Sequence, residues 1–486
     1  MSNEILNLEP KTLWKNFYSL TQIPRPSKKE EKAREFVVAF GKNLGLETIV
    51  DEVGNVIIRK PATPGMENRK GVIFQGHLDM VPQKNSDKVH DFEKDPIDAW
   101  IDGEWVKARG TTLGADNGMG VAAAMAVLES KDIPHGPVEA LFTIDEETGM
   151  AGAFGLKPGI LQGDILMNLD SEDEGELYIG CAGGTNGNIK FTYQEAQVPA
   201  GMLALKISVT GLKGGHSGVD IHLGRGNSNK ILNRFLWHAS KAFGLRLSSI
   251  DGGSLRNAIP RESFAVVAIP ADKKVDLLKF LVDFATKAKK ELSAVEPDMK
   301  MEAVAVDLPS FLIDEKTQNG LFNAIYGCPN GVIRMSNEME GLVETSTNLA
   351  IFKSENKEIT VRCLLRSSVD SAKEDLENMM QSVFELAGAT IIFDGQYPGW
   401  KPNPDSPILK AMLEIYSNQF GKTPKVTAIH AGLECGLLGG VYPKWDMISF
   451  GPTIRFPHSP DEKVNIETVK KFWDFLVETL KFVPVK

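Results

Sequence analysis

Histidines and carboxylates gather in five short clusters of this sequence, each at the end of an apolar segment or in the loop after one. The clusters are His77 with Asp79, Asp116, the triplet Asp145–Glu147, Asp170, and His458. Carboxylates at such density would repel one another and raise their own pKa values, and a bound divalent cation removes that conflict. Two imidazoles with several carboxylates, and no thiolate among them, favour zinc first and then cobalt or manganese. The residue types therefore predict a metal centre.

These clusters require elements that bring them together. From residue 71, the strand GVIFQGH, a helix over 118–130, and the strands VEALFTI and DILMNLD follow one another. This alternation is typical of an α/β layer with a mostly parallel sheet. Taken singly, an H-x-D pair is more often a surface feature and an acidic triplet a solvated loop. Because ligands bind beyond the carboxyl ends of parallel strands, the shared position of the clusters predicts one cleft.

The rest of the chain predicts an interrupted domain. Residues 12–45 have apolar positions at helical spacing, which predicts that the chain opens with a helix. ETIVDEVGNVIIRK indicates two short strands around a turn at Gly54-Asn55. From about residue 185, the pattern changes to alternating antiparallel strands mixed with helices, up to the Pro- and Gly-rich stretch 397–407. We therefore expect an α/β catalytic domain formed by residues 1–184 and 398–486, with a central mixed, mostly parallel sheet flanked by helices. Residues 185–397 are expected to form an inserted α+β domain.

Composition and charge limit the partners. The 486 residues carry 54 Lys and Arg against 64 Asp and Glu, a net charge of −10. This balance lacks the electrostatic attraction that a nucleic-acid binder or an anionic-membrane binder uses, so small molecules or peptides are the expected partners. Charges interrupt the N-terminal segment before an export signal is formed, and the four cysteines form no C-x-x-C pair. A cytoplasmic protein with reduced thiols is the prediction.

The ordered motifs resemble a known family. GHLDMVP, TTLGADNGMG, DEETG, NLDSED, GGHSG and PHSPDE occur in this order. They resemble the dinuclear-zinc metallopeptidases of the M20 family, and within it the aminoacyl-histidine dipeptidase branch of bacteria, over nearly the full length. The resemblance implies a zinc-peptidase-like catalytic domain with an inserted lid domain, two divalent metal ions, and hydrolysis of Xaa-His and related dipeptides. No G-x-S-x-G or H-E-x-x-H motif supports another hydrolase mechanism.

The resemblance also implies roles for individual residues. His77 and Asp170 would hold one metal, Glu147 and His458 the other, and Asp116 would bridge them. Glu146 would be the general base, and Asp79 would fix the tautomer of His77. A cis peptide bond is expected between Asp116 and Asn117.

Further residues would contact the substrate. His216 in GGHSG would stabilise the oxyanion, although a histidine between glycines can also be a simple turn residue. Asn257 and Arg366 match lid positions that contact substrate, and Arg366 would pair with the substrate carboxylate unless it is a structural cation at a strand end. Asp173 is the candidate for binding the α-amine, and Glu434 in GLECG matches a position near the substrate.

Other functions and the oligomeric state stay open at this stage. An M20 tripeptidase or an N-acyl amino acid aminoacylase would use the same chemistry. A non-catalytic metal-binding scaffold would be expected to have lost a ligand or the base, and none is missing here. The resemblance leaves a homodimer open, and the long insertion leaves open whether His216 acts within its own chain.

Overall fold

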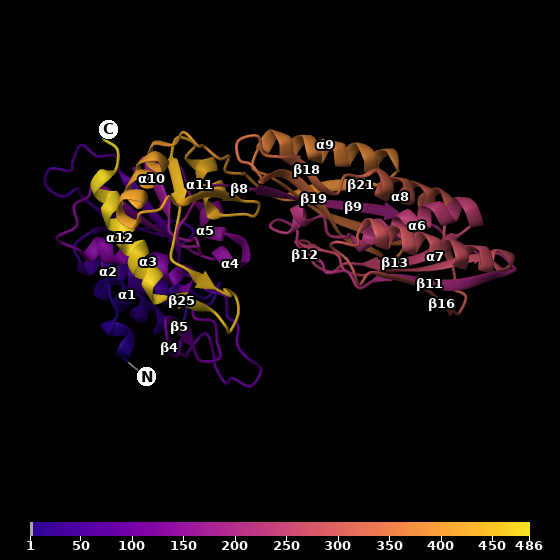
Figure 1. The fold of residues 1–486 in the computed structure, drawn as a ribbon, viewed down its shortest axis with the longest axis horizontal. Helices are drawn as coiled ribbons and strands as arrows, with labels where there is room; N and C mark the ends of the chain where they lie inside the picture. The colour runs from indigo at the N-terminus through magenta and orange to yellow at the C-terminus, as the bar shows by residue number, and fades with distance from the viewer. Residues whose placement is uncertain (1–2) are drawn as a thin grey trace. The chain divides into compact units, whose positions relative to one another are not determined.

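The structure, a computed structural model, describes residues 3–486 and separates into two units that interleave along the chain (Figure 1). The first unit comprises Met1–Cys181, Trp400–Ala428 and Leu433–Lys486, and the second comprises Ala182–Gly399 and Ile429–Gly432. The sequence analysis assigned 1–184 and 398–486 to the catalytic domain, whereas residues 182–184 and 398–399 group with the second unit. The short segment Ile429–Gly432 belongs instead to the second unit, because its main chain bonds there: the N–H of Ala182 donates to the carbonyls of Ile429 and Ala431.

The first unit is built on a mixed sheet with the strand order β1-β2-β6-β3-β7-β23-β8-β22 among the described residues. Its central strands β6, β3, β7 and β23 pair in parallel, whereas β1, β2 and β8 pair antiparallel at the margins. The predicted α/β class is confirmed, and the parallel pairing is confined to the centre. The strand bounds are β1 Glu47–Val50, β2 Val56–Lys60, β3 Val72–His77, β6 Val138–Thr143, β7 Ile165–Asn168, β8 Glu176–Cys181, β22 Lys425–Ile429 and β23 Asp446–Ser449.

Helices flank this sheet, and one prediction about them is wrong. Residues 12–45 form two helices rather than one, because Pro24 and Pro26 interrupt the helical backbone between them. The helices of the unit are η1 Asn3–Asn7, α1 Lys11–Thr21, α2 Glu31–Asn43, α3 Ala115–Glu129, α4 Glu146–Gly149, α5 Ala151–Gly155, α10 Pro407–Phe420, α11 Glu434–Val441 and α12 Ile466–Phe482. A small sheet that the sequence did not predict, in the order β24-β25-β5-β4, joins residues 99–108 to residues 454–465. Its strands are β4 Ala99–Asp102, β5 Trp105–Ala108, β24 Ile454–Arg455 and β25 Lys463–Asn465.

The second unit is an antiparallel sheet with helices packed on it, which agrees with the predicted α+β insertion. Its strand order is β16-β11-β15-β13-β19-β20-β9-β21, with β18 added beside β19. Apolar side chains from the helices and strands share one core, including Leu232, Phe235, Leu277, Phe322 and Phe384. The helices are α6 Ser228–Phe243, α7 Lys274–Glu291, α8 Glu315–Gly327 and α9 Asp370–Leu386, with the short turns η2 Ile221–Leu223 and η3 Ala271–Lys273.

The strands of the second unit's main sheet are β9 Gly183–Thr192, β11 Met202–Thr210, β13 Arg246–Gly252, β15 Ser263–Pro270, β16 Lys300–Val306, β18 Gly331–Met335, β19 Val343–Glu355, β20 Glu358–Ser367 and β21 Thr390–Tyr397. Two short pairs lie outside it, β10 Glu195–Ala196 with β17 Leu312–Ile313, and β12 Gly215–His216 with β14 Ala258–Ile259.

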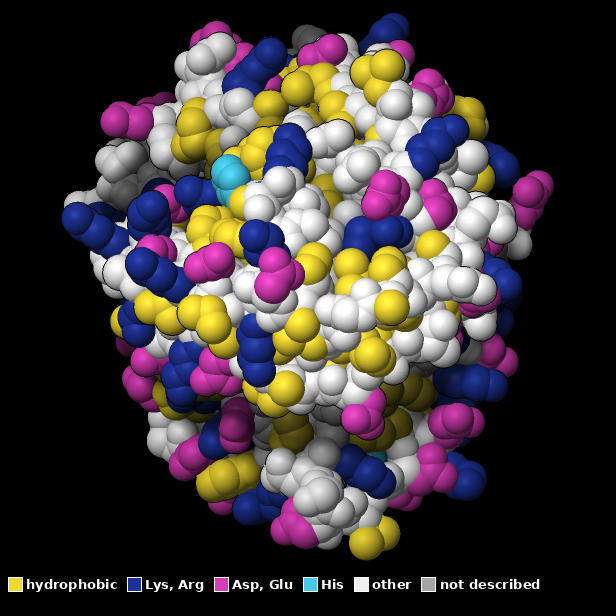
Figure 2. Space-filling view, turned by 90° about the vertical axis from the view of Figure 1, so that its right-hand side faces the viewer, with side chains coloured by type: hydrophobic (Ala, Val, Ile, Leu, Met, Phe, Trp, Pro, Cys, Tyr) yellow, Lys and Arg dark blue, Asp and Glu magenta, His cyan; other side chains and the backbone are white. Residues whose placement is uncertain are grey.

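No helix within residues 3–486 has the length and hydrophobicity needed to span a membrane. On the face drawn in Figure 2, the described Lys and Arg side chains are interspersed with Asp and Glu. That face therefore lacks the continuous basic stripe on which nucleic-acid binding depends.

Candidate metal centre

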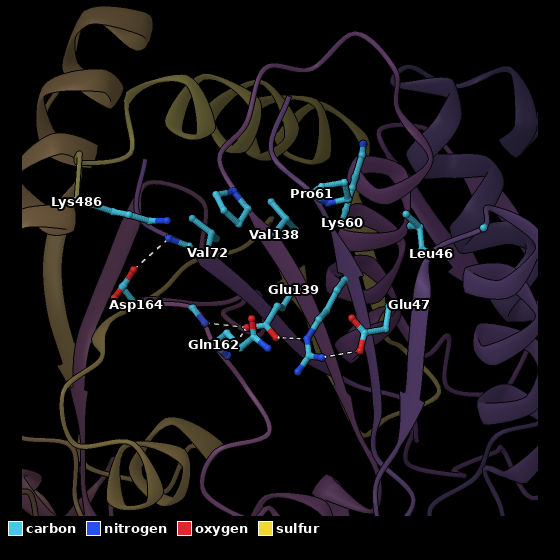
Figure 3. Close-up of a pocket in the computed structure, with 15 residues that line it drawn as sticks. Leu46, Glu47, Lys60, Pro61, Val72, Val138, Glu139, Gln162, Asp164 and Lys486 are labelled. Carbon is cyan, nitrogen blue, oxygen red and sulfur yellow. Dashed lines mark hydrogen bonds and ion pairs between the residues drawn. The ribbon is translucent and has the colours of Figure 1, made fainter. Parts of the chain in front are cut away.

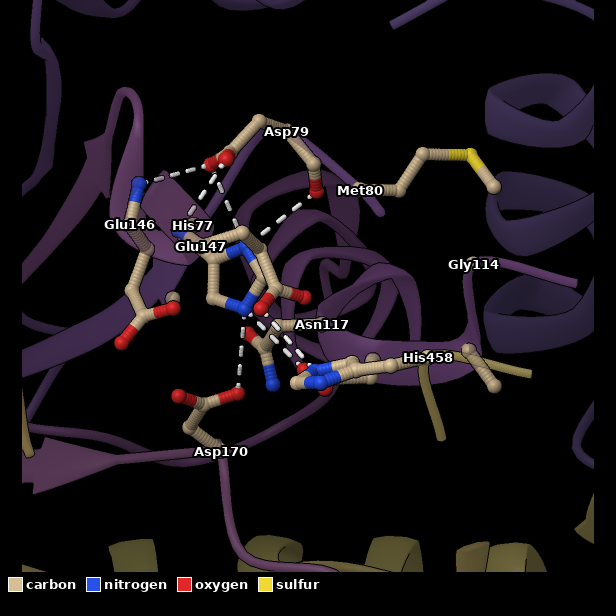
Figure 4. Close-up of polar contacts among 12 residues, drawn as sticks. His77, Asp79, Met80, Gly114, Asn117, Glu146, Glu147, Asp170 and His458 are labelled. Atoms are coloured by element: carbon tan, nitrogen blue, oxygen red, sulfur yellow. Dashed lines mark hydrogen bonds and ion pairs between the residues drawn. The ribbon is translucent and has the colours of Figure 1, made fainter. Parts of the chain in front are cut away.

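Three of the predicted ligands lie at or just after the carboxyl ends of the central parallel strands (Figure 4). His77 is the last residue of β3, Asp170 lies two residues after β7, and Glu147 lies at the start of α4, just after β6. Asp116 is in the first turn of α3, and His458 lies in the loop between β24 and β25. The fold of this unit therefore brings together residues that are up to 381 positions apart in the sequence (458 − 77).

Asp116 stands between two groups of ligand atoms. One oxygen, Oδ1, is 3.0 Å from Nε2 of His77, and that nitrogen is 3.4 Å from Oδ1 of Asp170. The other oxygen, Oδ2, is 3.2 Å from Nε2 of His458, which is 2.9 Å from Oε2 of Glu147. In each of the two triads, the ligand atoms lie within 4.8 Å of one another. One carboxylate thus serves two triads, each with one imidazole.

Asp79 connects the ring of His77 to the helix that carries Glu146 and Glu147. Its Oδ1 is 3.4 Å from Nδ1 of His77, and its carboxylate accepts the N–H groups of Glu146 and Glu147 at 3.0 and 3.2 Å. Burial opposes ionisation of Asp79, but the hydrogen bond and charge of His77 and the N–H of Glu146 outweigh it and lower the pKa to about 2. An ionised Asp79 therefore holds His77 with Nε2 directed at Asp116.

The centre is strongly acidic, and its pKa values reflect this. Hydrogen bonds to Asp116 and Glu147 raise the pKa of His458 to about 11. Burial, reinforced by the charges of Asp116 and Glu147, raises the pKa of Asp170 to about 7. Burial also raises the pKa of Glu146 well above its ordinary value, with the charge of Asp170 adding to the effect. The cluster thus favours any added positive charge, whether protons or cations.

The donor set fits divalent cations. Among the described residues, the buried atoms Oε1 of Glu147 and Oδ1 of Asp170 have no hydrogen-bond donor. Carboxylate oxygens that are buried without a hydrogen bond are costly unless a cation binds them. The set contains imidazole nitrogens and carboxylate oxygens, which suits zinc, cobalt or manganese. The peptide bond between Asp116 and Asn117 is cis, as the family resemblance implied.

Two predicted substrate residues of this unit have partners of their own. Glu434, at the start of α11, is buried and accepts hydrogen bonds from Nε2 of Gln75 and Oγ1 of Thr143, at 2.5 and 2.8 Å. Burial raises its pKa to about 7. Asp173 instead pairs with Nη1 of Arg455 at 2.8 Å.

Within the second unit, the structure brings His216 and Asn257 together. Strand β12, which ends at His216, pairs with β14, and the N–H of Ser217 donates to the carbonyl of Asn257 at 2.8 Å. Nδ1 of His216 accepts the N–H groups of Gly218 and Val219 at 3.1 and 3.2 Å. Burial and the nearby charge of Arg366 lower the pKa of His216. The ring is therefore neutral with its proton on Nε2, which leaves Nε2 as a hydrogen-bond donor.

Arg366 lies in a cluster that contains a histidine missed by the sequence analysis. Arg366 is buried on β20, directly opposite Ser346 on β19, and its Nη1 donates to Oη of Tyr397 at 3.3 Å. The hydroxyl of Ser346 is 2.7 Å from Nε2 of His430. Burial, together with the charge of Arg366, lowers the pKa of His430 to about 3. His430 lies only four residues before Glu434 in the sequence. Its proximity to the GLECG motif is the sequence feature that could have marked it as a candidate.

The sequence analysis also missed two buried charged residues, Arg25 and Glu462, which bond to the loops that carry the ligands. Glu462 is the last residue of the PHSPDE motif, so its position was visible although its contacts were not. Arg25 stands between two prolines in IPRPS, a segment that cannot continue a helix.

Comparisons with known proteins identify the family of the chain. The profile of peptidase family M20/M25/M40 matches residues 73–481. The chain is 50% identical over 487 aligned residues to the cytosol non-specific dipeptidase of Escherichia coli strain K12, covering 100% of both chains. Among solved structures, the aminoacylhistidine dipeptidase of Vibrio alginolyticus superposes with a TM-score of 0.95 at 52% identity, covering 100% of this chain and 99% of that one.

A more distant structure shares the fold alone. The aminopeptidase PepT of Bacillus cereus superposes with a TM-score of 0.58 at 16% identity, covering 98% of this chain and 99% of that one. Together, the match over most of the chain and the full-length relatives confirm the resemblance drawn from the motifs. The chain belongs to peptidase family M20/M25/M40.

Proposed function

We propose that this protein is a dinuclear-metal dipeptidase that hydrolyses Xaa-His and related dipeptides. The observation that carries the proposal is the position of the Asp116 carboxylate, with one oxygen toward His77 and the other toward His458. A carboxylate placed in this way suits a bridge between two cations. The full-length relatives named for dipeptidase activity support the reaction class.

The proposed metals are two zinc ions. His77 and Asp170 would hold one, Glu147 and His458 the other, with Asp116 shared. Two such ions, when bound, polarise the scissile carbonyl and lower the pKa of an attacking water toward about 7. Cobalt or manganese suits the same nitrogen and oxygen donors.

Glu146 is the proposed general base. In one triad of possible ligand atoms, its carboxylate lies within 4.8 Å of the ligand atoms of His77 and Glu147. A carboxylate at this position can accept a proton from water and pass it to the leaving amine. Asp79 would act through His77, by keeping Nε2 free for the metal.

The second unit is proposed to supply a donor and a cation. His216, neutral with Nε2–H as donor, is suited to stabilise the oxyanion of the tetrahedral intermediate. Arg366, with a buried Nε that has no acceptor among the described residues, is suited to bind the substrate carboxylate. Asn257, whose main chain bonds to the loop of His216, is proposed to contact the substrate beside it.

Replacing His216 by alanine should lower kcat by about 10²–10³-fold while KM changes little, because an oxyanion bond forms mainly in the transition state. Steady-state kinetics with one Xaa-His dipeptide would measure both constants. His222, which also lies in the second unit, provides the matched control, and His222→Ala should keep the wild-type kcat. A His216→Ala effect confined to KM would make His216 a ground-state contact.

The α-amine needs an acidic partner near the metals. Asp173 was the sequence candidate, and its pairing with Arg455 reduces the charge that it can offer. Glu172 is the second candidate. It stands two residues after Asp170 in the sequence, and burial, followed by the charges of Asp116 and Asp170, raises its pKa to about 8. Glu434, buried beside Gln75 and Thr143, is proposed to support the substrate region rather than to bind a terminus.

A dipeptidase must bind both charged termini of its substrate, the α-amine and the carboxylate. We expect N-acetylation or C-terminal amidation of a Xaa-His dipeptide to lower kcat/KM by at least ~30-fold, because each removes an ion pair in a desolvated site. Initial rates for the free, acetylated and amidated forms of one dipeptide would measure this. If the N-acetylated form reacts as fast as the free one, the aminoacylase alternative replaces the dipeptidase.

The remaining proposals concern specificity, location and assembly. An M20 tripeptidase is the nearest alternative, and equal rates for dipeptides and tripeptides of the same residues would favour it. A non-catalytic scaffold would bind zinc and hydrolyse none of these peptides. We propose a cytoplasmic location, since the four cysteines are buried free thiols and the Escherichia coli relative is named for the cytosol. A homodimer is proposed from the family resemblance alone, and sedimentation of the purified protein would test it.

A further inference from the structure

Arg25 and Glu462 are buried charged residues that come from opposite ends of the chain. Arg25 lies before α2 and Glu462 lies just before β25, and each side chain is 2% exposed. Within residues 3–486, their side-chain hydrogen bonds go to the main chain of the two loops that carry His77, Asp79 and Asp116. Burying two charges is unfavourable unless each is fully bonded, so these contacts need a reason beyond packing.

Glu462 fixes the path of the loop that ends at Asp116. Its Oε2 accepts the N–H groups of Leu113 and Gly114 at 2.7 and 2.9 Å, and its Oε1 accepts those of Ala115 and Asp116 at 2.7 and 3.2 Å. Hydrogen bonds to a charged acceptor are stronger than neutral ones. Four consecutive N–H groups on one carboxylate therefore leave this loop little freedom.

Arg25 joins the same loop to the one that follows His77. Its Nη1 donates to the carbonyls of Leu78 and Asp79, both at 2.9 Å, and its Nη2 donates to the carbonyl of Gly114 at 2.5 Å. Gly114 is thus held on its N–H side by Glu462 and on its carbonyl side by Arg25. A Cβ at Gly114 would lie 2.6 Å from Nη2 of Arg25, and its φ is +71°, so both the contact and the backbone require glycine.

We infer that Arg25 and Glu462 are positioning residues, which hold Asp116 and the His77–Asp79 loop in the geometry for metal binding before a cation arrives. The inference rests on the proposed metal centre and adds two residues outside its ligand set. Ligands that are already ordered bind a metal without the entropy cost of ordering them. Loss of a group that orients them therefore lowers the affinity for the metal.

Because Arg25 is positively charged, the inference can be tested by whether its removal raises or lowers the affinity for zinc. A guanidinium near two cations repels them, so electrostatics alone predicts that removing Arg25 strengthens metal binding. Positioning predicts the opposite, since both loops lose an anchor. The direction of the change in zinc affinity thus separates the two accounts.

The test compares Arg25→Met and Glu462→Gln with a matched control, Glu139→Gln. Glu139 is also buried, accepts two main-chain N–H groups, from Gln162 at 2.7 Å and Gly163 at 2.8 Å, and pairs with Nε of Arg59 at 2.8 Å (Figure 3). It lies near the start of β6, whereas the metal centre lies beyond the end of that strand. The control therefore removes the same kind of interaction away from the ligands.

Zinc affinity of the full-length protein, stripped with a chelator, would be measured by competition with a chromophoric chelator, and the absorption spectrum after loading with cobalt would report ligand geometry. We expect Arg25→Met and Glu462→Gln to bind zinc about 10–100-fold more weakly, with a changed cobalt spectrum. Glu139→Gln should keep the wild-type zinc affinity and cobalt spectrum, even if its melting temperature falls as much as that of the other two variants.

Circular dichroism would establish that each variant is folded. If Arg25→Met does not fold, Arg25→Lys replaces it, because an ammonium keeps the charge but lacks the planar fork that reaches three carbonyls. Folded variants with wild-type or tighter zinc binding and an unchanged cobalt spectrum would overturn the inference. A wild-type protein that binds no zinc would instead overturn the proposed function.

Discussion

Replacing Glu146 by glutamine should lower kcat for a Xaa-His dipeptide by at least about 10²–10⁴-fold, because the amide cannot take the proton of the attacking water. Metal content should stay at the wild-type level, since the main-chain N–H of residue 146 that bonds Asp79 is retained. Steady-state kinetics together with metal analysis of the same preparation would measure both. This combination of lost turnover and retained metal identifies a base rather than a ligand.

Asp145→Asn is the matched control for that experiment. Asp145 precedes Glu146 and bonds to Oγ1 of Thr148 rather than to the ligands. Its φ is +50°, a conformation that asparagine tolerates well, so this variant should keep the wild-type kcat. Wild-type turnover in Glu146→Gln would remove Glu146 from the mechanism.

Asp116→Ala is expected to weaken metal binding by more than about 100-fold, since even the loss of a group that merely orients a ligand costs 10–100-fold. Without this carboxylate, both triads lose a ligand, and the imidazoles of His77 and His458 lose the partner between them. Metal analysis after dialysis should find the protein depleted and activity lost in parallel.

Asp173→Asn serves as its control, because Asp173 lies three residues beyond Asp170 but pairs with Arg455 instead of joining a triad. It should retain both metals. An Asp116→Ala protein with the metal content of the wild type would contradict the bridging assignment.

The positions of three proposed ligands could be predicted from the sequence for a simple physical reason. His77, Glu147 and Asp170 lie at or just after the fully buried strands β3, β6 and β7, and parallel strands bring their carboxyl ends to one edge. Asp116 and His458 lie outside these strands and were found from the motifs alone. The ordered motifs supplied the assignment to two triads. The helix predicted over 12–45 was wrong because apolar spacing continued through IPRPS, where the prolines end it.

The contacts of Glu462, Arg25 and His430 could not be predicted in the same way. Glu462 bonds to main-chain groups up to 349 residues away, and every residue type except proline offers an N–H. His430 joins the second unit although the segments around it belong to the first. Such roles depend on tertiary contacts between main-chain and side-chain groups, which leave no periodic signal in the sequence.

The central claim is that two metals on this chain hydrolyse a dipeptide, and zinc titration of the chelator-stripped, full-length protein tests it most directly. Hydrolysis of one free Xaa-His dipeptide would be followed as zinc is added. We predict negligible activity at the start, a rise until two equivalents are bound, and no further rise beyond them. Full activity in the stripped protein, or no hydrolysis with two equivalents bound, would contradict the account.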